Sequence, residues 1–208
     1  MQNFIYLIGD PATREAAVVD PGWEVPKILD AVRQDGYKLT AAFVTHHHFD
    51  HTQGLNELLQ AADVPVYVHE ADAPLLTIAR SSLKPVSGGE TIPVGRIPLT
   101  LIHTPGHTEG SQCLMVDAST SLGTGGILLT GDTLFIKACG RWDLPGGDPA
   151  KLYDSLNVKL KALDEATVVY PGHNYADRPV STIGEEKREN PFLQPPSREA
   201  FLRAISAG

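Results

Sequence analysis

Stretches of apolar and β-branched residues alternate along the chain with segments in which apolar residues recur every three or four positions. The first pattern is typical of buried strands and the second of amphipathic helices. The pattern predicts strands at residues 3–8, 16–19, 41–45, 66–69, 99–103, 112–116, 127–130 and 167–170, and helices at 25–35, 55–61, 150–163, 181–189 and 197–207. Helices interspersed among short, hairpin-like connections favour an α/β protein with two sheets covered by helices over a singly wound parallel sheet.

Four of the predicted strands are followed by histidine or aspartate beside a glycine or proline. AAFV runs into THHHFDH, LTLIH into TPGHTEG, ILLT into GDTLF, and TVVY into PGHNY. Because a rigid strand can aim the loop side chains that follow it, these donors are expected to converge. The donors are His46, His48, Asp50, His51, His107, Asp132 and His173. Seven imidazole and carboxylate groups exceed the needs of one tetrahedral zinc ion and suit two adjacent divalent metals that share one carboxylate.

The other histidines fit ordinary structural roles. His47 alternates away from its two neighbours, while His69 and His103 lie within predicted strands. A lone loop histidine more often binds nothing than binds a metal. Four of the eight histidines nevertheless lie within residues 46–51, which argues against a chance cluster.

Composition places limits on the partners. The 208 residues contain no low-complexity linker, so residues 1–208 are predicted to form a single domain. With 17 lysines and arginines against 25 acidic residues, the formal net charge is −8. Nucleic-acid phosphates require a positively charged face, so a small-molecule substrate is favoured over nucleic acid.

The chain shows no sign of export or of membrane insertion. Its first ten residues, MQNFIYLIGD, lack the basic region and continuous apolar run of a signal peptide, and no apolar stretch reaches membrane-spanning length. We therefore expect a cytoplasmic protein without a membrane partner. Cys113 and Cys139 are too few for a disulfide framework and are expected to be buried free thiols.

Taken in order, the H-x-H-x-D-H, TPGHT, GDTLF and PGH motifs resemble those of the metallo-β-lactamase superfamily. The resemblance implies an αββα sandwich, with two mixed sheets flanked by helices and the metals at one edge. It assigns a first metal to His46, His48 and His107, a second to Asp50, His51 and His173, and a bridging role to Asp132. It also implies that Asp20, in VVDPG, orients a metal-bound histidine, which suits an imidazole whose other N–H needs a partner. Zinc is the expected metal, with iron or manganese as alternatives.

Within the superfamily, the chain resembles the branch of glyoxalase II and persulfide dioxygenase. The shared features are ACGRWD at 138–143 and a tyrosine just after the last histidine motif. By this resemblance, Arg141 and Tyr175 contact the thiol part of the substrate, and a guanidinium suits a carboxylate. A surface ion pair is the alternative role for Arg141. The basic C-terminal extension of glyoxalase II is absent, and Asp143 stands in place of its tyrosine, so glutathione and another thiol both remain candidates.

The resulting functional hypothesis is a metallo-hydrolase that cleaves a thioester or related ester with a metal-bridging hydroxide. Asp50 and Asp132 are the predicted catalytic carboxylates, because as ligands they position that hydroxide. The alternative is an iron persulfide dioxygenase that uses only His46, His107 and Asp132. A lactonase and a non-catalytic metal-binding protein are further alternatives, although no sequence feature favours the latter.

Overall fold

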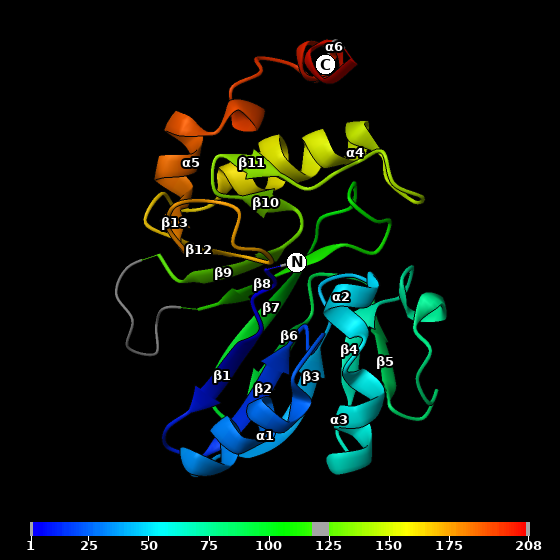
Figure 1. Cartoon of the computed structure of the whole chain (residues 1–208). Coiled ribbons are helices and arrows are strands. Elements are labelled where there is room, and N and C mark those ends of the chain that lie inside the picture. Colours follow the sequence, from blue (N-terminus) through cyan, green and yellow to red (C-terminus); the bar gives the residue numbers. More distant parts are fainter. Residues whose placement is uncertain (1, 118–124, 207–208) are drawn as a thin grey trace.

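In the computed structural model, which describes residues 2–117 and 125–206, two β-sheets pack face to face and helices cover both outer faces (Figure 1). The first sheet has the order β1-β2-β3-β4-β5. Its strands are β1 (Tyr6–Asp10), β2 (Glu15–Val19), β3 (Lys38–Phe43), β4 (Val66–His69) and β5 (Leu83–Val86). Strand β1 is antiparallel to β2 and the other pairs are parallel. The sheet is therefore mixed, as predicted.

The second sheet has the order β13-β12-β9-β8-β7-β6. Its strands are β6 (Thr91–Val94), β7 (Ile97–His103), β8 (Gln112–Val116), β9 (Ile127–Gly131), β12 (Val168–Pro171) and β13 (Ser181–Thr182). Only β9 and β12 run parallel to each other. A small hairpin of β10 (Leu134–Phe135) and β11 (Ala138–Cys139) follows β9.

Helices form the two outer layers. They are α1 (Val25–Gln34), α2 (Phe49–Thr52), α3 (Leu55–Ala61), α4 (Pro149–Asp154), α5 (Ile183–Glu189) and α6 (Arg198–Ser206). In Figure 1, α1 and α3 lie at one end of the layers and α4, α5 and α6 at the other. Short helical turns occupy Ala73–Leu75 and Pro191–Leu193. None of the helices within the described residues is both long and apolar enough to cross a membrane.

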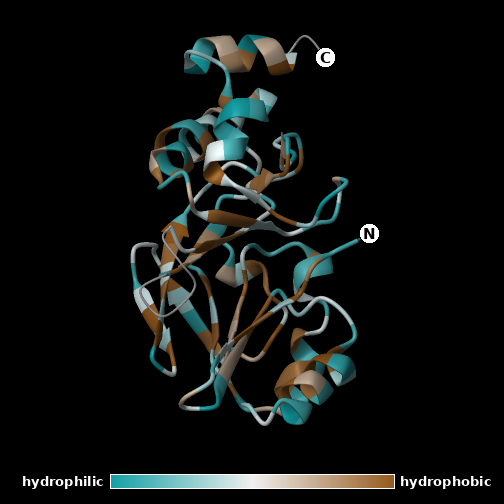
Figure 2. Ribbon diagram, turned by 90° about the vertical axis from the view of Figure 1, so that its left-hand side faces the viewer, coloured by the Kyte–Doolittle hydropathy of each residue, from teal (hydrophilic) through white to brown (hydrophobic). Residues whose placement is uncertain are grey.

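Three apolar clusters fill the spaces between the four layers. One joins α1 and α3 to the first sheet, one lies between the sheets around Phe43, Leu101 and Leu114, and one joins α4 to the second sheet. Figure 2 shows many apolar residues along the strands, whereas the helices carry both apolar and polar residues. Full burial of a leucine such as Leu101 or Leu152 contributes about 1.5–3 kcal/mol to stability. These layers confirm the predicted αββα sandwich.

Some predicted boundaries were wrong. The first strand begins at Tyr6, because Asn3 instead forms an isolated bridge with His173. The helix predicted at 150–163 is a regular α-helix only to Asp154, and it continues as a π-helical turn (Ser155–Lys159) and a 3₁₀ turn (Leu160–Ala162). The helix predicted at 181–189 begins at Ile183, since β13 takes its first two residues.

The last predicted helix occupies Arg198–Ser206, and its predicted final residue, Ala207, lies outside the described residues. The pattern missed β5, β6, β10, β11 and β13. Strands β5 and β6 contain Pro85 and Pro93, which weaken a strand signal. Both are edge strands, where a missing N–H donor is tolerated.

Candidate metal centre

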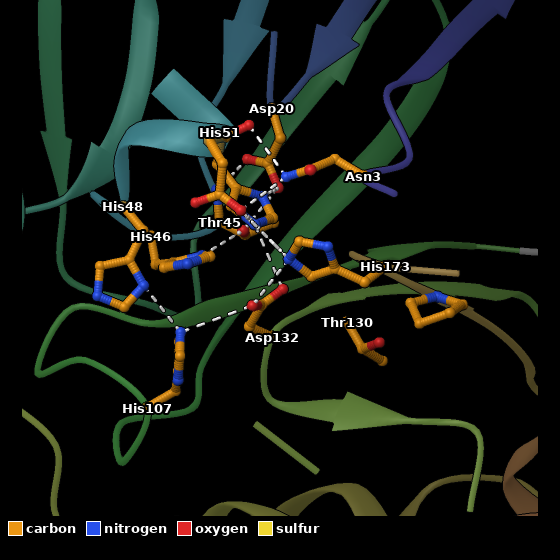
Figure 3. Close-up of polar contacts among 12 residues, drawn as sticks. Asn3, Asp20, Thr45, His46, His48, His51, His107, Thr130, Asp132 and His173 are labelled. Carbon is orange, nitrogen blue, oxygen red and sulfur yellow. Dashed lines mark hydrogen bonds and ion pairs between the residues drawn. The ribbon is translucent and has the colours of Figure 1, made fainter. Parts of the chain in front are cut away.

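The seven predicted donors meet at one edge of the sandwich. His46 and His48 follow β3, and Asp50 and His51 lie on the short helix α2. The other three, His107, Asp132 and His173, lie in the connections that follow β7, β9 and β12. Figure 3 shows His48 and His107 on one side of Asp132, with His51 and His173 on the other.

The first donor set is His46, His48 and His107, whose ligand atoms lie within 4.8 Å of one another. The Nε2 atom of His107 and the Nδ1 atom of His48 are 3.0 Å apart. Two nitrogens bound to one tetrahedral zinc at about 2.0–2.1 Å would be about 3.3 Å apart. His46 Nε2 is buried and has no hydrogen-bond partner among the described residues. The set therefore has the spacing and the free lone pair that a divalent cation needs.

The second donor set is Asp50, His51 and His173, again within 4.8 Å. The Nε2 atoms of His51 and His173 are 3.3 Å apart, and Asp50 Oδ2 lies 3.4 Å from His173 Nε2. Asp132 faces both sets, since its Oδ1 is 3.4 Å from His51 Nε2 and its Oδ2 is 3.7 Å from His107 Nε2. This carboxylate is placed where it could reach two cations.

Three of the histidines have their second ring nitrogen held by another group. His51 Nδ1 donates to Asp20 Oδ2 over 2.9 Å, and His107 Nδ1 donates to the carbonyl of Arg141 over 2.6 Å. Thr45 Oγ1 donates to Asp20 over 2.7 Å, so it accepts from His46 Nδ1 at 3.0 Å. Protonation at Nδ1 leaves Nε2 with the lone pair that a metal accepts.

The match to known proteins agrees with this geometry. A model of the metallo-beta-lactamase superfamily matches residues 1–173. The chain belongs to the metallo-β-lactamase superfamily. This confirms the predicted family and fold.

Relatives within the superfamily cover most of the chain. A hydroxyacylglutathione hydrolase from Alkalilimnicola ehrlichii is 40% identical over 198 residues, which are 95% of this chain and 72% of the relative. Among solved structures, ETHE1 from Myxococcus xanthus has a TM-score of 0.85 at 34% identity and covers 99% of this chain and 85% of its own. TTHA1623 in a di-iron-bound form has a TM-score of 0.76 at 33% identity, covering 92% and 96%.

The surroundings of this superfamily site keep most donors in the protonation state that binds a metal. Burial lowers the pKa of His46 and of His107, and lowers the pKa of His48 to about 4. Burial would raise the pKa of Asp132, but hydrogen bonds with His173 and His51 hold it well below its usual range. Burial also acts to lower the pKa of His51, but the carboxylates of Asp20 and Asp132 raise it to about 10. A metal ion must therefore displace a proton from His51.

Several residues that the sequence analysis did not single out hold the donors in place. Asn3 Nδ2 donates to Asp50 Oδ2 over 2.9 Å and to the Asp50 carbonyl over 3.1 Å. Asp72 accepts from the His47 N–H at 2.9 Å and from Thr108 Oγ1 at 2.8 Å, so it ties the His46–His51 loop to the His107 loop. The contacts of Asn3 and Asp72 join positions far apart in the chain, so no local pattern reveals them.

Two glycines make room for Asp132. A Cβ atom on Gly140 would lie 1.7 Å from the Asp132 carbonyl oxygen, and one on Gly172 would lie 2.4 Å from Asp132 Oδ1. Any larger residue would push the backbone or this carboxylate away from the donor sets. The PGH motif therefore needs its glycine for close approach to Asp132.

The other three histidines lie outside the two donor sets. His47 Nδ1 is 3.0 Å from Asp72 Oδ2. His69 and His103 stack on each other with ring centroids 3.8 Å apart, and each has Nε2 within hydrogen-bond distance of a backbone carbonyl. These contacts agree with the structural roles that the sequence predicts for them.

A cavity of about 460 Å³ opens onto the donors. Both predicted substrate-contact residues, Arg141 and Tyr175, line it, together with Phe49, Phe135 and Leu144. Tyr175 stacks on His173, with ring centroids 4.8 Å apart. Arg141 also forms the ion pair that was its alternative role, with Asp143 as partner. A larger cavity, of about 660 Å³ beside Tyr6 and Tyr170, contacts none of the seven donors.

Cys113 and Cys139 are both free. Cys113 is buried as predicted, whereas Cys139 is only half-buried and lines the cavity beside the donors. Burial raises the pKa of the Cys139 thiol to about 12. At neutral pH this side chain is a neutral thiol and a poor nucleophile.

Proposed function

We propose that this protein is a metal-dependent hydrolase that cleaves a thioester or a related ester. The observation that carries the proposal is the pair of complete donor sets on either side of Asp132. The 40% sequence identity to a hydroxyacylglutathione hydrolase supports a thioester as the substrate class. The cavity of about 460 Å³ beside the donors leaves room for a small-molecule substrate.

The donors fit two divalent cations. His46, His48 and His107 would hold one, while Asp50, His51 and His173 would hold the other, with Asp132 shared between them. Imidazole and carboxylate ligands suit zinc best, and iron and manganese also accept them. When bound, such ions lower the pKa of a water from about 15.7 toward about 7 and polarise a carbonyl oxygen.

The protein groups then have separate tasks. Asp132, which faces both donor sets, and Asp50, which belongs to the second set, would position the attacking water as metal ligands. Arg141 and Tyr175 hold the thiol part of the substrate at the mouth of the cavity. The thiolate that leaves a thioester needs little protonation, so no dedicated acid is required. Cys139 takes no part as a nucleophile, because its thiol stays protonated.

The test is an anaerobic hydrolysis assay with the zinc-loaded protein. Release of free thiol from an acyl thioester, at the same rate with and without oxygen, is the expected result. Arg141→Ala should raise KM for a thioester that carries a carboxylate on its thiol part, with little change in kcat, because Arg141 contributes to uniform binding of that part. Oxygen consumption with a thiol persulfide, with sulfite as product and no thioester turnover, would instead assign a mononuclear iron dioxygenase that uses His46, His107 and Asp132.

A further inference from the structure

An ion pair with two parallel hydrogen bonds lies at the mouth of the cavity. Arg141 Nε and Nη2 donate to Asp143 Oδ1 and Oδ2 over 2.9 and 2.8 Å. The side chains are 67% and 56% exposed, so neither is held by packing. The Nε/Nη2 edge of the guanidinium, one of the two edges that could bind a carboxylate from a substrate, is already bound to one from its own chain, which also balances the positive charge of Arg141.

No second lysine or arginine in the part of the cavity lining that the structure describes could bind a substrate carboxylate in place of Arg141. Among the described residues that line it, Arg141 is the only lysine or arginine. The other residues at the mouth are apolar or aromatic, and Phe49 and Tyr175 are 59% and 62% exposed. His107 donates to the backbone carbonyl of Arg141, so the backbone that carries this side chain is tied to one of the donors.

We propose that Asp143 is a specificity-determining residue that selects thioesters with an uncharged group at the cavity mouth over thioesters with a carboxylate there. The inference rests on the proposed thioester hydrolysis. A substrate carboxylate must either displace Asp143 from Arg141 or bind the remaining edge of a guanidinium whose charge Asp143 already balances, and in both cases it lies close to the negative charge of Asp143. An uncharged group meets neither penalty and can pack on the rings of Phe49 and Tyr175.

The size of the effect follows from the exposure of the pair. Breaking one exposed ion pair changes an equilibrium a few-fold, and a like charge at about 4–5 Å in water adds a similar factor. Together they predict a five- to tenfold discrimination against carboxylates. Because both terms are screened by ions, the discrimination should shrink at about 1 M salt.

The experiment compares two substrates that share one acyl group. S-lactoylglutathione carries carboxylates on its thiol part, and the S-lactoyl thioester of N-acetylcysteamine carries none. Asp143→Asn keeps the side-chain shape and removes the charge. We expect it to lower KM for S-lactoylglutathione about five- to tenfold relative to the neutral thioester, with little change in kcat. The shift should disappear at high salt.

Two further variants separate this role from a general charge effect. In an Arg141→Gln background, Asp143→Asn should no longer change the ratio of the two KM values, because Asp143 acts through Arg141. Asp177→Asn makes the same charge change at an exposed residue that does not line the cavity, and should leave the ratio unchanged. An equal shift in Asp177→Asn, or an unchanged ratio in Asp143→Asn, would overturn the proposal.

A binding measurement keeps this inference separate from the proposed reaction. S-methylglutathione carries the same carboxylates but cannot be hydrolysed as a thioester, so its affinity can be measured by titration calorimetry. Asp143→Asn should tighten binding about five- to tenfold, and only when Arg141 is present. If binding tightens but no thioester is cleaved, the proposed function fails and the role of Asp143 in ligand selection stands. Absence of binding to every variant, or equal binding to all, overturns that role.

Discussion

The cluster of seven donors and the mouth of the cavity, formed by Arg141, Asp143 and Tyr175, lie side by side but differ in how their side chains are held. In the cluster, His46 and His51 are each 1% exposed and each has its second nitrogen held by another residue. At the mouth, Arg141 and Tyr175 have side chains that are mostly in solvent. The donors are therefore fixed before any ligand binds, whereas the mouth can change its contacts at little cost in stability.

This difference predicts that substitutions in the two regions have different effects. A substitution in the cluster disturbs several hydrogen bonds at once, because Asp20 contacts both Thr45 and His51. A substitution at the mouth disturbs one exposed pair. The chemistry should therefore be sensitive to small changes of shape, while substrate choice should respond to single charges.

Asp132→Asn is expected to have the largest effect, because it replaces the anion that faces both donor sets with a neutral amide. Zinc measured by elemental analysis after dialysis should fall well below two ions per chain, and hydrolysis should fall by more than about 100-fold. Asp50→Asn is the matched variant. It leaves His46, His48 and His107 intact and should keep about one ion. Loss of one ion from both variants alike would contradict the bridging position.

Asp20→Asn should weaken zinc binding about 10- to 100-fold, since an amide no longer gives His51 Nδ1 a charged acceptor. Competition with a chelating dye measures the change. Asp63→Asn makes the same substitution at an exposed residue away from the donors and serves as the control. If both variants bind zinc as tightly as the parent, the cluster does not depend on its supporting hydrogen bonds.

The affinity for zinc should also depend on pH. The carboxylates of Asp20 and Asp132 raise the pKa of His51 to about 10, against burial, which lowers it. Below that pH His51 is protonated, and this proton competes with zinc for the ring nitrogen. Zinc binding therefore strengthens as the pH rises toward 10. The slope is at most about tenfold per pH unit for one proton. Calorimetry in buffers of different ionisation enthalpy counts the protons released, and Asp20→Asn should release fewer. No release between pH 6 and 9 would show that His51 is already neutral.

His47→Ala should have the smallest effect. His47 pairs with Asp72 and belongs to neither donor set, so two zinc ions should remain by elemental analysis. The backbone N–H of residue 47 still donates to Asp72 in this variant, which preserves the loop. A clear loss of metal would indicate that His47 is a ligand like His46 and His48, and would contradict the proposed donor sets.

The sequence predicted which histidines and aspartates come together better than it predicted the residues that support them. Each donor follows a strand with a marked apolar pattern, so His107 and His173 could be placed at one edge from sequence alone. Asn3 and Asp72 could not, because their contacts with Asp50 and Thr108 join positions 47 and 36 residues apart. Asp143 was visible only as a departure from a family pattern. Its ion pair with Arg141 depends on side-chain directions that a sequence does not give.

The strands and helices likewise differ in how well the sequence predicted them. Strand β8, QCLMV, is mostly apolar and was predicted with its observed bounds, whereas β7 contains Pro98 and was predicted only from residue 99. The edge strands β5 and β6 carry prolines, and their pairing depends on neighbours distant in sequence. The end of α4 changes to a π-helical turn although Leu152, Leu156 and Leu160 keep a helical spacing. Apolar periodicity alone does not distinguish these helix types.

The most direct test of two metal sites around Asp132 is anomalous X-ray diffraction from zinc-loaded crystals at the zinc absorption edge. We expect two peaks, one about 2.0–2.1 Å from nitrogens of His46, His48 and His107, and one at a similar distance from His51 and His173. The Asp132 carboxylate should lie between the two peaks. A single peak held by His46, His107 and Asp132, with the remaining donors unbound, would contradict the account and favour the mononuclear alternative.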